Sequence, residues 1–185
     1  MEKKKFLTVQ DMVLIAVFTA LTAVCSLVQI PAGPIPFTLQ TFAVFTTGGL
    51  LGSKKGTIAI IIYILLGVIG IPVFAGGKSG PGVIVGPTGG YITGFIFTII
   101  IIGMITKIFR KNKTWLNITM TFISMVLGDL VCFVIGTIQF MAVMETSLEV
   151  ALGYCVIPFI IPDLIKMAVA VVVVNRVKKY VKIFD

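Results

Sequence analysis

Long apolar runs separated by short polar or Gly- and Pro-rich connections fill almost the whole chain. The runs cover residues 8–30, 38–51, 57–71, 88–108, 115–144 and 148–174. A helix needs about 20 predominantly apolar residues to cross a bilayer, so the second and third runs, of 14 and 15 residues, are short for a full span. The pattern nevertheless predicts six transmembrane helices in one membrane-embedded domain, residues 1–185.

The composition agrees with a membrane location. Hydrophobic residues make up 58% of the chain and charged residues only 12%. A soluble domain of 185 residues would need many more polar side chains to cover its surface. We therefore predict an all-α integral membrane protein surrounded by the lipid bilayer.

The basic residues are confined almost entirely to one side of the six predicted spans. Thirteen of the fifteen lie in the clusters Lys3–Lys5, Lys54–Lys55, Lys107–Lys113 and Arg176–Lys182. Because cytoplasmic connections of membrane proteins are rich in Lys and Arg, we predict that both termini are cytoplasmic. The connections at 31–37, 72–87 and 145–147 then lie outside. The net charge of +8 follows from this distribution, and we expect no nucleic-acid partner.

Asp163 and Lys166 lie inside the last apolar run, where an ionisable side chain is costly unless it faces a partner, a cavity or a ligand. Helix geometry places Lys166 roughly 15 Å and Asp163 roughly 20 Å from the basic end of the run at Arg176. Residues three apart share a helix face. The two side chains are predicted either to grip one polar molecule or to form a structural ion pair that ties two helices together.

The connection between the third and fourth runs is rich in Gly and Pro, and a connection of this length without structure of its own is commonly a lid or a binding loop. It ends in the motif Gly86–Tyr91, Gly-Pro-Thr-Gly-Gly-Tyr. Gly89 and Gly90 permit close backbone approach, and the N–H groups and helix dipole there favour a ligand carboxylate or carbonyl. Thr88 is either an N-cap or a ligand contact, and Tyr91 offers a ring that stacks and hydrogen bonds.

Ala16, Ala20 and Ala23 form a stripe of small residues on the first predicted helix, which opens with a capping-box-like pair, Thr8 and Asp11. Small residues at this spacing let a second helix approach closely in a membrane. The stripe is expected to pack either inside this chain or against a partner.

Asp129 is a second carboxylate within an apolar run, and it has no obvious partner in the sequence. Its predicted roles are a salt bridge with Lys166, a place in a binding pocket, or helix packing through a hydroxyl such as that of Thr137. The three cysteines lack metal-ligand spacing and the chain has no His. We therefore expect buried cysteines with a packing role, no metal site and no enzymatic activity.

Three motifs in this order resemble those of the BioY family, the biotin-specific substrate-binding (S) components of energy-coupling-factor (ECF) transporters. They are Pro36–Gln40, Gly86–Tyr91 and Pro162–Lys166. The resemblance covers essentially the whole chain. It implies an S-component fold of six helices in a prokaryotic plasma membrane, with biotin captured from outside as the transported ligand and no cofactor. It also implies a membrane coupling (T) subunit and two ATPase subunits as partners, with Ala16 and Ala20 facing the coupling subunit.

The chemistry of biotin suits these residues. Its ureido ring has two N–H donors and one carbonyl acceptor, so Asp163 is expected to accept from the ring and Lys166 to donate to it through charge-assisted bonds. Gln40 is expected to add an amide, with Thr38 from the same motif beside it.

The apolar and acidic parts of biotin have candidate contacts as well. Phe37 and Tyr91 are expected to cover the thiophane ring and the valeryl chain. The valerate carboxylate is expected to contact either Lys78 or the backbone amides around Gly89.

Other functions remain open from the residues themselves. An S component for another vitamin, such as thiamine or riboflavin, is the nearest alternative. A self-sufficient proton-coupled carrier, with Asp163 and Asp129 as proton sites, is an alternative of a different class. An intramembrane enzyme is the third.

Overall fold

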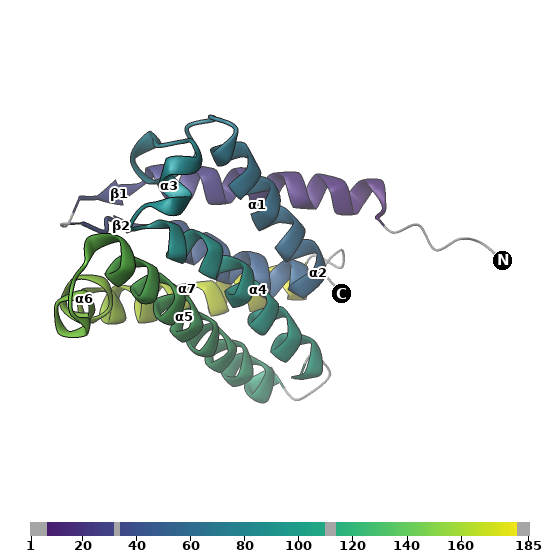
Figure 1. The fold of residues 1–185 in the computed structure, drawn as a ribbon. Helices are drawn as coiled ribbons and strands as arrows, with labels where there is room; N and C mark the ends of the chain where they lie inside the picture. The colour runs from purple at the N-terminus through teal and green to yellow at the C-terminus, as the bar shows by residue number, and fades with distance from the viewer. Residues whose placement is uncertain (1–6, 32–33, 110–113, 181–185) are drawn as a thin grey trace.

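The computed structural model describes residues 7–31, 34–109 and 114–180, and it is almost entirely helical (Figure 1). The helices are α1 (Val9–Leu27), α2 (Gln40–Val68), α3 (Pro81–Val85), α4 (Gly89–Phe109), α5 (Thr114–Met144), α6 (Leu148–Cys155) and α7 (Ile157–Tyr180). A 3-10 turn, η1 (Ala75–Gly77), and two strands, β1 (Gln29–Ile30) and β2 (Phe37–Thr38), complete the described part. Five helical segments, of which the last joins α6 and α7, are long and apolar enough to cross a membrane. The predicted all-α membrane class is confirmed, whereas the number of crossings and the side of the termini stay predictions.

The predicted second and third spans form the single element α2, which folds back on itself at Gly52. Gly52 has a φ of 71° and a ψ of −176°, a conformation that side chains with a Cβ rarely adopt. A Cβ on Gly56 would lie 3.5 Å from the Thr47 side chain, and the Gln40 amide bonds the Tyr63 hydroxyl, so the two halves run side by side. The expected connection over residues 52–56 is therefore wrong in length, since the chain turns at one residue.

Two of the predicted outer connections contain regular structure. β1 and β2 pair as an antiparallel hairpin around the Pro-rich segment, which ends α1 at Leu27 rather than near Ile30. The segment from Gly70 to Thr88, which we call the lid, contains η1 and α3 and so differs from the structureless loop expected there. Pro81 occupies the first turn of α3, where a missing N–H is tolerated.

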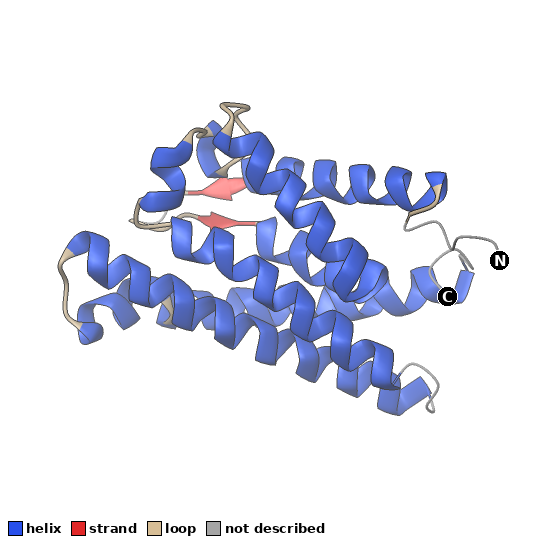
Figure 2. Cartoon of the chain, turned by 45° about the vertical axis from the view of Figure 1, so that its right-hand side comes forward, coloured by secondary structure: helices blue, strands red, loops and turns tan. Residues whose placement is uncertain are grey.

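The last predicted span is divided into α6 and α7 at Val156, whose φ of −123° is not helical. Pro158 follows two residues later in the first turn of α7, a position that proline favours at the start of a helix. The hairpin, the lid and α6 gather at one end of the bundle, while the start of α1 and the end of α7 lie at the other (Figures 1 and 2).

The helix α4 lies at the centre of the bundle, packed against α2 on one side and α5 on the other. Glycines make these approaches possible, because a Cβ on Gly94 would lie 3.1 Å from Cys132 and one on Gly128 would lie 3.0 Å from Thr98. Thr98 also donates a hydrogen bond to the Gly128 carbonyl. The bundle is thus held by close backbone contacts, as expected for helices that have no hydrophobic drive to associate in lipid.

Gly103→Ala is expected to lower the thermal melting temperature of the purified chain. A Cβ at Gly103 would lie 2.0 Å from the backbone nitrogen of Ser53. Its nearest neighbours are all backbone atoms in the turn of α2, so no flexible side chain can move away from it. Overpacking of this kind costs about 1–3 kcal/mol. The matched control is Gly153→Ala in α6, where an added Cβ meets nothing within 4 Å. Equal melting temperatures for the two variants would contradict this account of the α2–α4 contact.

The predicted capping box at the start of α1 is present, with Thr8 and Asp11 exchanging hydrogen bonds of 3.0 and 3.2 Å. Asp11 also pairs with Lys55 at 2.5 Å, which ties the start of α1 to the turn of α2. On the same helix Ala16 and Ala20 are exposed, whereas Ala23 is partly buried against the core. The stripe of small residues therefore leaves its first two members on the outside of the bundle.

Candidate functional site

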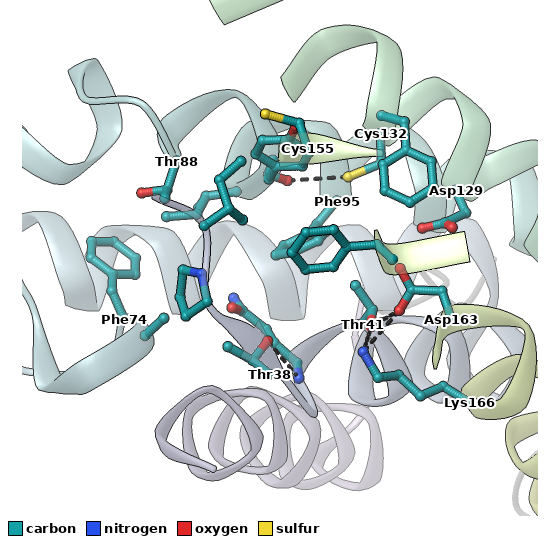
Figure 3. Close-up of a pocket in the computed structure, with 18 of the residues that line it drawn as sticks. Thr38, Thr41, Phe74, Thr88, Phe95, Asp129, Cys132, Cys155, Asp163 and Lys166 are labelled. Carbon is teal, nitrogen blue, oxygen red and sulfur yellow. Dashed lines mark hydrogen bonds and ion pairs between the residues drawn. The ribbon is translucent and has the colours of Figure 1, made fainter. Parts of the chain in front are cut away.

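A cavity opens between the helices at the end of the bundle that carries the hairpin and the lid (Figure 3). It is lined by residues of the hairpin, α2, the lid, α4, α5, α6 and α7. Eight of the predicted ligand-binding residues line it: Thr38, Gln40, Lys78, Thr88, Tyr91, Asp129, Asp163 and Lys166. Residues far apart in the sequence thus meet around one enclosed space.

A charged cluster closes one end of the cavity. Lys166 Nζ lies 2.8 Å from Asp163 Oδ1 and 3.0 Å from Thr41 Oγ1, and the Thr41 hydroxyl donates to the same carboxylate oxygen at 2.9 Å. Asp163 is 2% exposed and the Lys166 side chain 13% exposed, so the pair is largely shielded from solvent. The pair lies within α7, and Thr41 joins it to α2.

The local sequence of α7 places this cluster. Asp163 and Lys166 are one helical turn apart, so both side chains point to the same face. Pro162 lies inside the helix and removes one backbone hydrogen bond from the turn that precedes Asp163. Thr41 and Lys166 both bond to Oδ1 of the Asp163 carboxylate, and within residues 7–31, 34–109 and 114–180 its Oδ2 has no hydrogen-bond partner.

Asp129 of α5 joins this end of the cavity and is 4% exposed. It interacts electrostatically with Asp163 and Lys166. In the described part of the chain its carboxyl group has no hydrogen bond or salt bridge, and the Thr137 hydroxyl lies instead 3.5 Å from that of Tyr91. Of the three roles considered for Asp129, the structure places it in the cavity.

Figure 3 shows Asp129, Asp163, Lys166 and Thr41 together at one side of the cavity and Phe74 and Thr88 at the other. The walls between are mostly apolar and aromatic, from Phe95, Phe133, Phe159, Cys132 and Cys155. The cavity therefore offers a molecule one charged polar end and an apolar middle, the usual composition of a small-molecule site.

Buried contacts hold the first part of the lid against the bundle. Phe74 is fully buried, and a Cβ on Gly67 would lie 2.0 Å from its ring, so this glycine is required for the ring to fit. The Tyr63 hydroxyl donates to the Val73 carbonyl at 3.0 Å, and the Gln40 amide donates to Tyr63 at 2.8 Å. Gln40 therefore connects the cavity wall to the lid.

A second set of contacts, two hydrogen bonds from α5, holds the last part of the lid. Gln139 of α5 donates from Nε2 to the carbonyls of Ile84 and Gly86, at 2.7 and 2.8 Å. In the sequence Lys78 lies between these two sets of contacts and Thr88 follows them, and Lys78 is exposed at the rim of the cavity. In the part of the chain that the structure describes, the Thr88 hydroxyl has no hydrogen-bond partner, so the capping bond considered for it does not form.

The remaining three predicted residues lie beside the cavity rather than in its lining. Phe37 stacks on Phe159 with ring centroids 4.4 Å apart, and Phe159 itself lines the cavity. A Cβ on Gly89 would lie 1.7 Å from the Ile84 carbonyl oxygen, and one on Gly90 would lie 2.7 Å from that of Ile135. Both glycines therefore bring the start of α4 close to the lid and to α5.

Several lining residues escaped the sequence prediction. Thr41 follows the Pro36–Gln40 motif directly, and Phe159 lies one helical turn before Asp163, so position along a helix could have indicated both. Phe74 had no such signal, because its place depends on how the lid folds over α2.

Comparison with known proteins places the chain in a family. The family model described as "BioY family" matches residues 1–183. A protein of Thermotoga maritima named "Biotin transporter BioY" is 40% identical over 164 residues, covering 88% of this chain and 92% of that protein. A "Probable biotin transporter BioY" of Pyrococcus horikoshii is 37% identical over 169 residues, covering 91% of this chain and 96% of that protein.

A solved structure has the same fold. It is a crystal structure described as the S-component for biotin from an ECF-type ABC transporter, and it superposes with a TM-score of 0.84. Sequence identity is 30%, and the match covers 96% of each chain. The fold, the sequence match along nearly the whole chain and the relatives agree, and this chain belongs to the BioY family.

Proposed function

We propose that this chain binds biotin in the cavity and serves as the substrate-binding subunit of an ECF-type transporter for biotin uptake. The observation that carries the proposal is the cluster of Asp163, Lys166 and Asp129 at one end of a cavity whose middle is mostly apolar. The names of the BioY relatives and of the superposed S-component support the same ligand.

The charged end suits a cyclic urea. Asp163 Oδ2 and the Asp129 carboxyl group are acceptors without partners among the described residues, and biotin offers two ureido N–H donors. Lys166 has an ammonium with three N–H donors, of which two are directed at Thr41 and Asp163, so a third can reach the ureido carbonyl. Charge-assisted bonds of this kind are the strong ones in an enclosed site.

The rest of the molecule then extends toward the lid. Tyr91, Phe95 and Phe159 would contact the thiophane ring and the valeryl chain. The valerate carboxylate would reach the rim, where Lys78 supplies a cation and Thr88 a hydroxyl. Gly89 and Gly90 contribute to this end by holding the start of α4 against the lid.

Calorimetric titration of the detergent-purified chain tests the ligand. We expect biotin to bind with one molecule per chain, and thiamine and riboflavin to neither bind nor compete. Desthiobiotin, which keeps the ureido ring and lacks the thioether, is expected to compete. Binding of another vitamin in preference to biotin would contradict the proposal.

Transport would require partners, a membrane coupling subunit and two ATP-hydrolysing subunits. Support comes from the superposed S-component, which belongs to an ECF-type ABC transporter, and from the exposed pair Ala16 and Ala20 on α1. A close helix contact at small residues is the means by which membrane helices associate.

Replacing both Ala16 and Ala20 by Leu is expected to abolish co-purification with the coupling subunit while leaving biotin binding unchanged. The larger side chains would push a partner helix away from α1 and do not touch the cavity. Val13→Leu, at a site 57% exposed on the same helix, is the control and should assemble normally. Unimpaired assembly of the double variant would remove α1 from the interface.

A proton-coupled carrier is the second candidate, and the carboxyl group of Asp129 near Asp163, which has no partner in the described part of the chain, favours it. Uptake into proteoliposomes separates the two. Biotin accumulation driven by a pH gradient, with this chain as the sole protein, would support the carrier. Accumulation only with the coupling and ATPase subunits and ATP supports the proposed function.

Gln139→Leu is expected to raise the biotin dissociation rate about thirtyfold, because the two lid carbonyls that Gln139 holds lose their donor and each such bond contributes about 1 kcal/mol. Release of labelled biotin after dilution measures the rate. Thr119→Val removes a hydroxyl bond to Trp115 on the same helix, away from the lid, and should leave the rate unchanged. An unaltered rate for Gln139→Leu would mean that the lid does not control release.

A further inference from the structure

A second hollow lies between the start of α5 and the end of α7. These two helix ends lie at the end of the bundle opposite the hairpin and the lid (Figure 1). Its volume is about 690 Å³. From α5 it receives Thr114 and Asn117, and from α7 it receives Asn175, Arg176 and Lys179. We call it the α5–α7 groove. The proposed biotin site uses none of these residues.

The groove is strongly positive. Arg176 and Lys179 are exposed at its edge, and Lys178 also lines it. No carboxylate lies in its lining as far as residues 7–31, 34–109 and 114–180 show. The helix α5, of 31 residues, also begins at this end, and the positive end of its dipole adds to the attraction for an anion.

The walls change from polar to apolar along the helices. Ile118, Val171 and Val172 line the groove one to two turns further into the bundle, and Val172 is 60% exposed. Trp115, the sole tryptophan of the chain, is 77% exposed at the start of α5, and tryptophan is enriched where a membrane meets water. The groove thus has basic residues at its rim and apolar walls below, at the boundary between membrane and water. This arrangement is complementary to a lipid with an anionic headgroup and alkyl tails.

We propose that the α5–α7 groove binds the headgroup of an anionic phospholipid. Arg176 pairs with the phosphate, Lys179 and the start of α5 supply further donors, and the acyl chains lie along Val171, Val172 and Ile118. Basic hollows between membrane helices are suited to such headgroups, and charge complementarity selects phosphatidylglycerol over the zwitterionic phosphatidylcholine.

Trp115 provides a reporter beside the groove. The full chain is reconstituted in phosphatidylcholine vesicles that contain a small fraction of lipid brominated on its acyl chains, either phosphatidylglycerol or phosphatidylcholine. We expect Trp115 fluorescence to be quenched at about tenfold lower mole fraction by brominated phosphatidylglycerol. The double variant Arg176→Gln/Lys179→Gln should lose this preference.

Lys54→Gln/Lys107→Gln is the matched control, because both residues are exposed, lie on the same predicted side and are absent from the groove lining. It should keep the preference, and biotin titration should show both double variants folded.

Equal loss of the lipid preference in both double variants would mean that general surface charge attracts the lipid. Displacement of the brominated lipid by inorganic phosphate would identify a free-anion site instead. A groove variant that keeps the lipid preference but fails to assemble with the coupling subunit would identify a protein contact. Each of these three results overturns the proposal.

Discussion

Asp163→Asn is expected to weaken biotin binding by about two orders of magnitude while the chain stays folded. The asparagine keeps the size of the side chain but replaces one acceptor oxygen by a donor, and hydrogen bonds to charged groups contribute about 1.5–3 kcal/mol. Lys166 keeps a hydroxyl partner in Thr41 and is itself partly exposed, so stability should fall much less than affinity.

Calorimetric titration with biotin measures the affinity of this variant, and thermal melting checks its fold. Asp11→Asn is the control for loss of a carboxylate, because Asp11 pairs with Lys55 away from the cavity. It should bind biotin like the unaltered chain. If Asp163→Asn also retained full affinity, the carboxylate would not be a ligand of the ureido ring.

Lys166→Met is expected to destabilise the chain as well as abolish biotin binding. Removing the ammonium leaves Asp163, 2% exposed, with only the Thr41 hydroxyl, and Asp129 adds a second carboxyl group nearby. Breaking a buried pair by removing one partner costs about 3–5 kcal/mol. The melting temperature and the biotin affinity of this variant should therefore fall together.

The neutral pair Asp163→Asn/Lys166→Met separates a structural role from a binding role. The double variant has no charge at either position, so no buried Asp163 carboxylate is left without its cation. Most of the stability lost in Lys166→Met should therefore return. Biotin affinity should not return, because the acceptor and the donor are both gone. Recovery of affinity along with stability would mean that the pair only ties α7 to α2.

Features that depend on neighbours along the chain were predictable. The i,i+3 spacing of Asp163 and Lys166 was sufficient to infer one polar face, and the Thr8–Asp11 capping box has the pattern expected at a helix start. The place of Thr41 beside the Pro36–Gln40 motif could have been noted, but its contact with Asp163 was not predictable, because it joins residues 122 positions apart.

The errors in the fold have local causes. A five-residue connection was expected around Gly52 because lysines and glycines interrupt the apolar pattern, but one residue with a positive φ suffices to reverse a chain. The break at Val156 lies within continuous hydrophobicity, and the signal for it is Pro158 in the first turn of the new helix. Short α3 buries little and leaves almost no periodic pattern, although Pro81 marks its start.

A crystal structure of the chain with biotin bound tests the central claim most directly. We predict that the ureido ring lies within hydrogen-bond distance of Asp163 and Lys166, with one N–H near Asp129 and the valerate directed to Lys78. A ring found elsewhere, with Asp163 and Lys166 bonded only to each other and to Thr41, would contradict the claim.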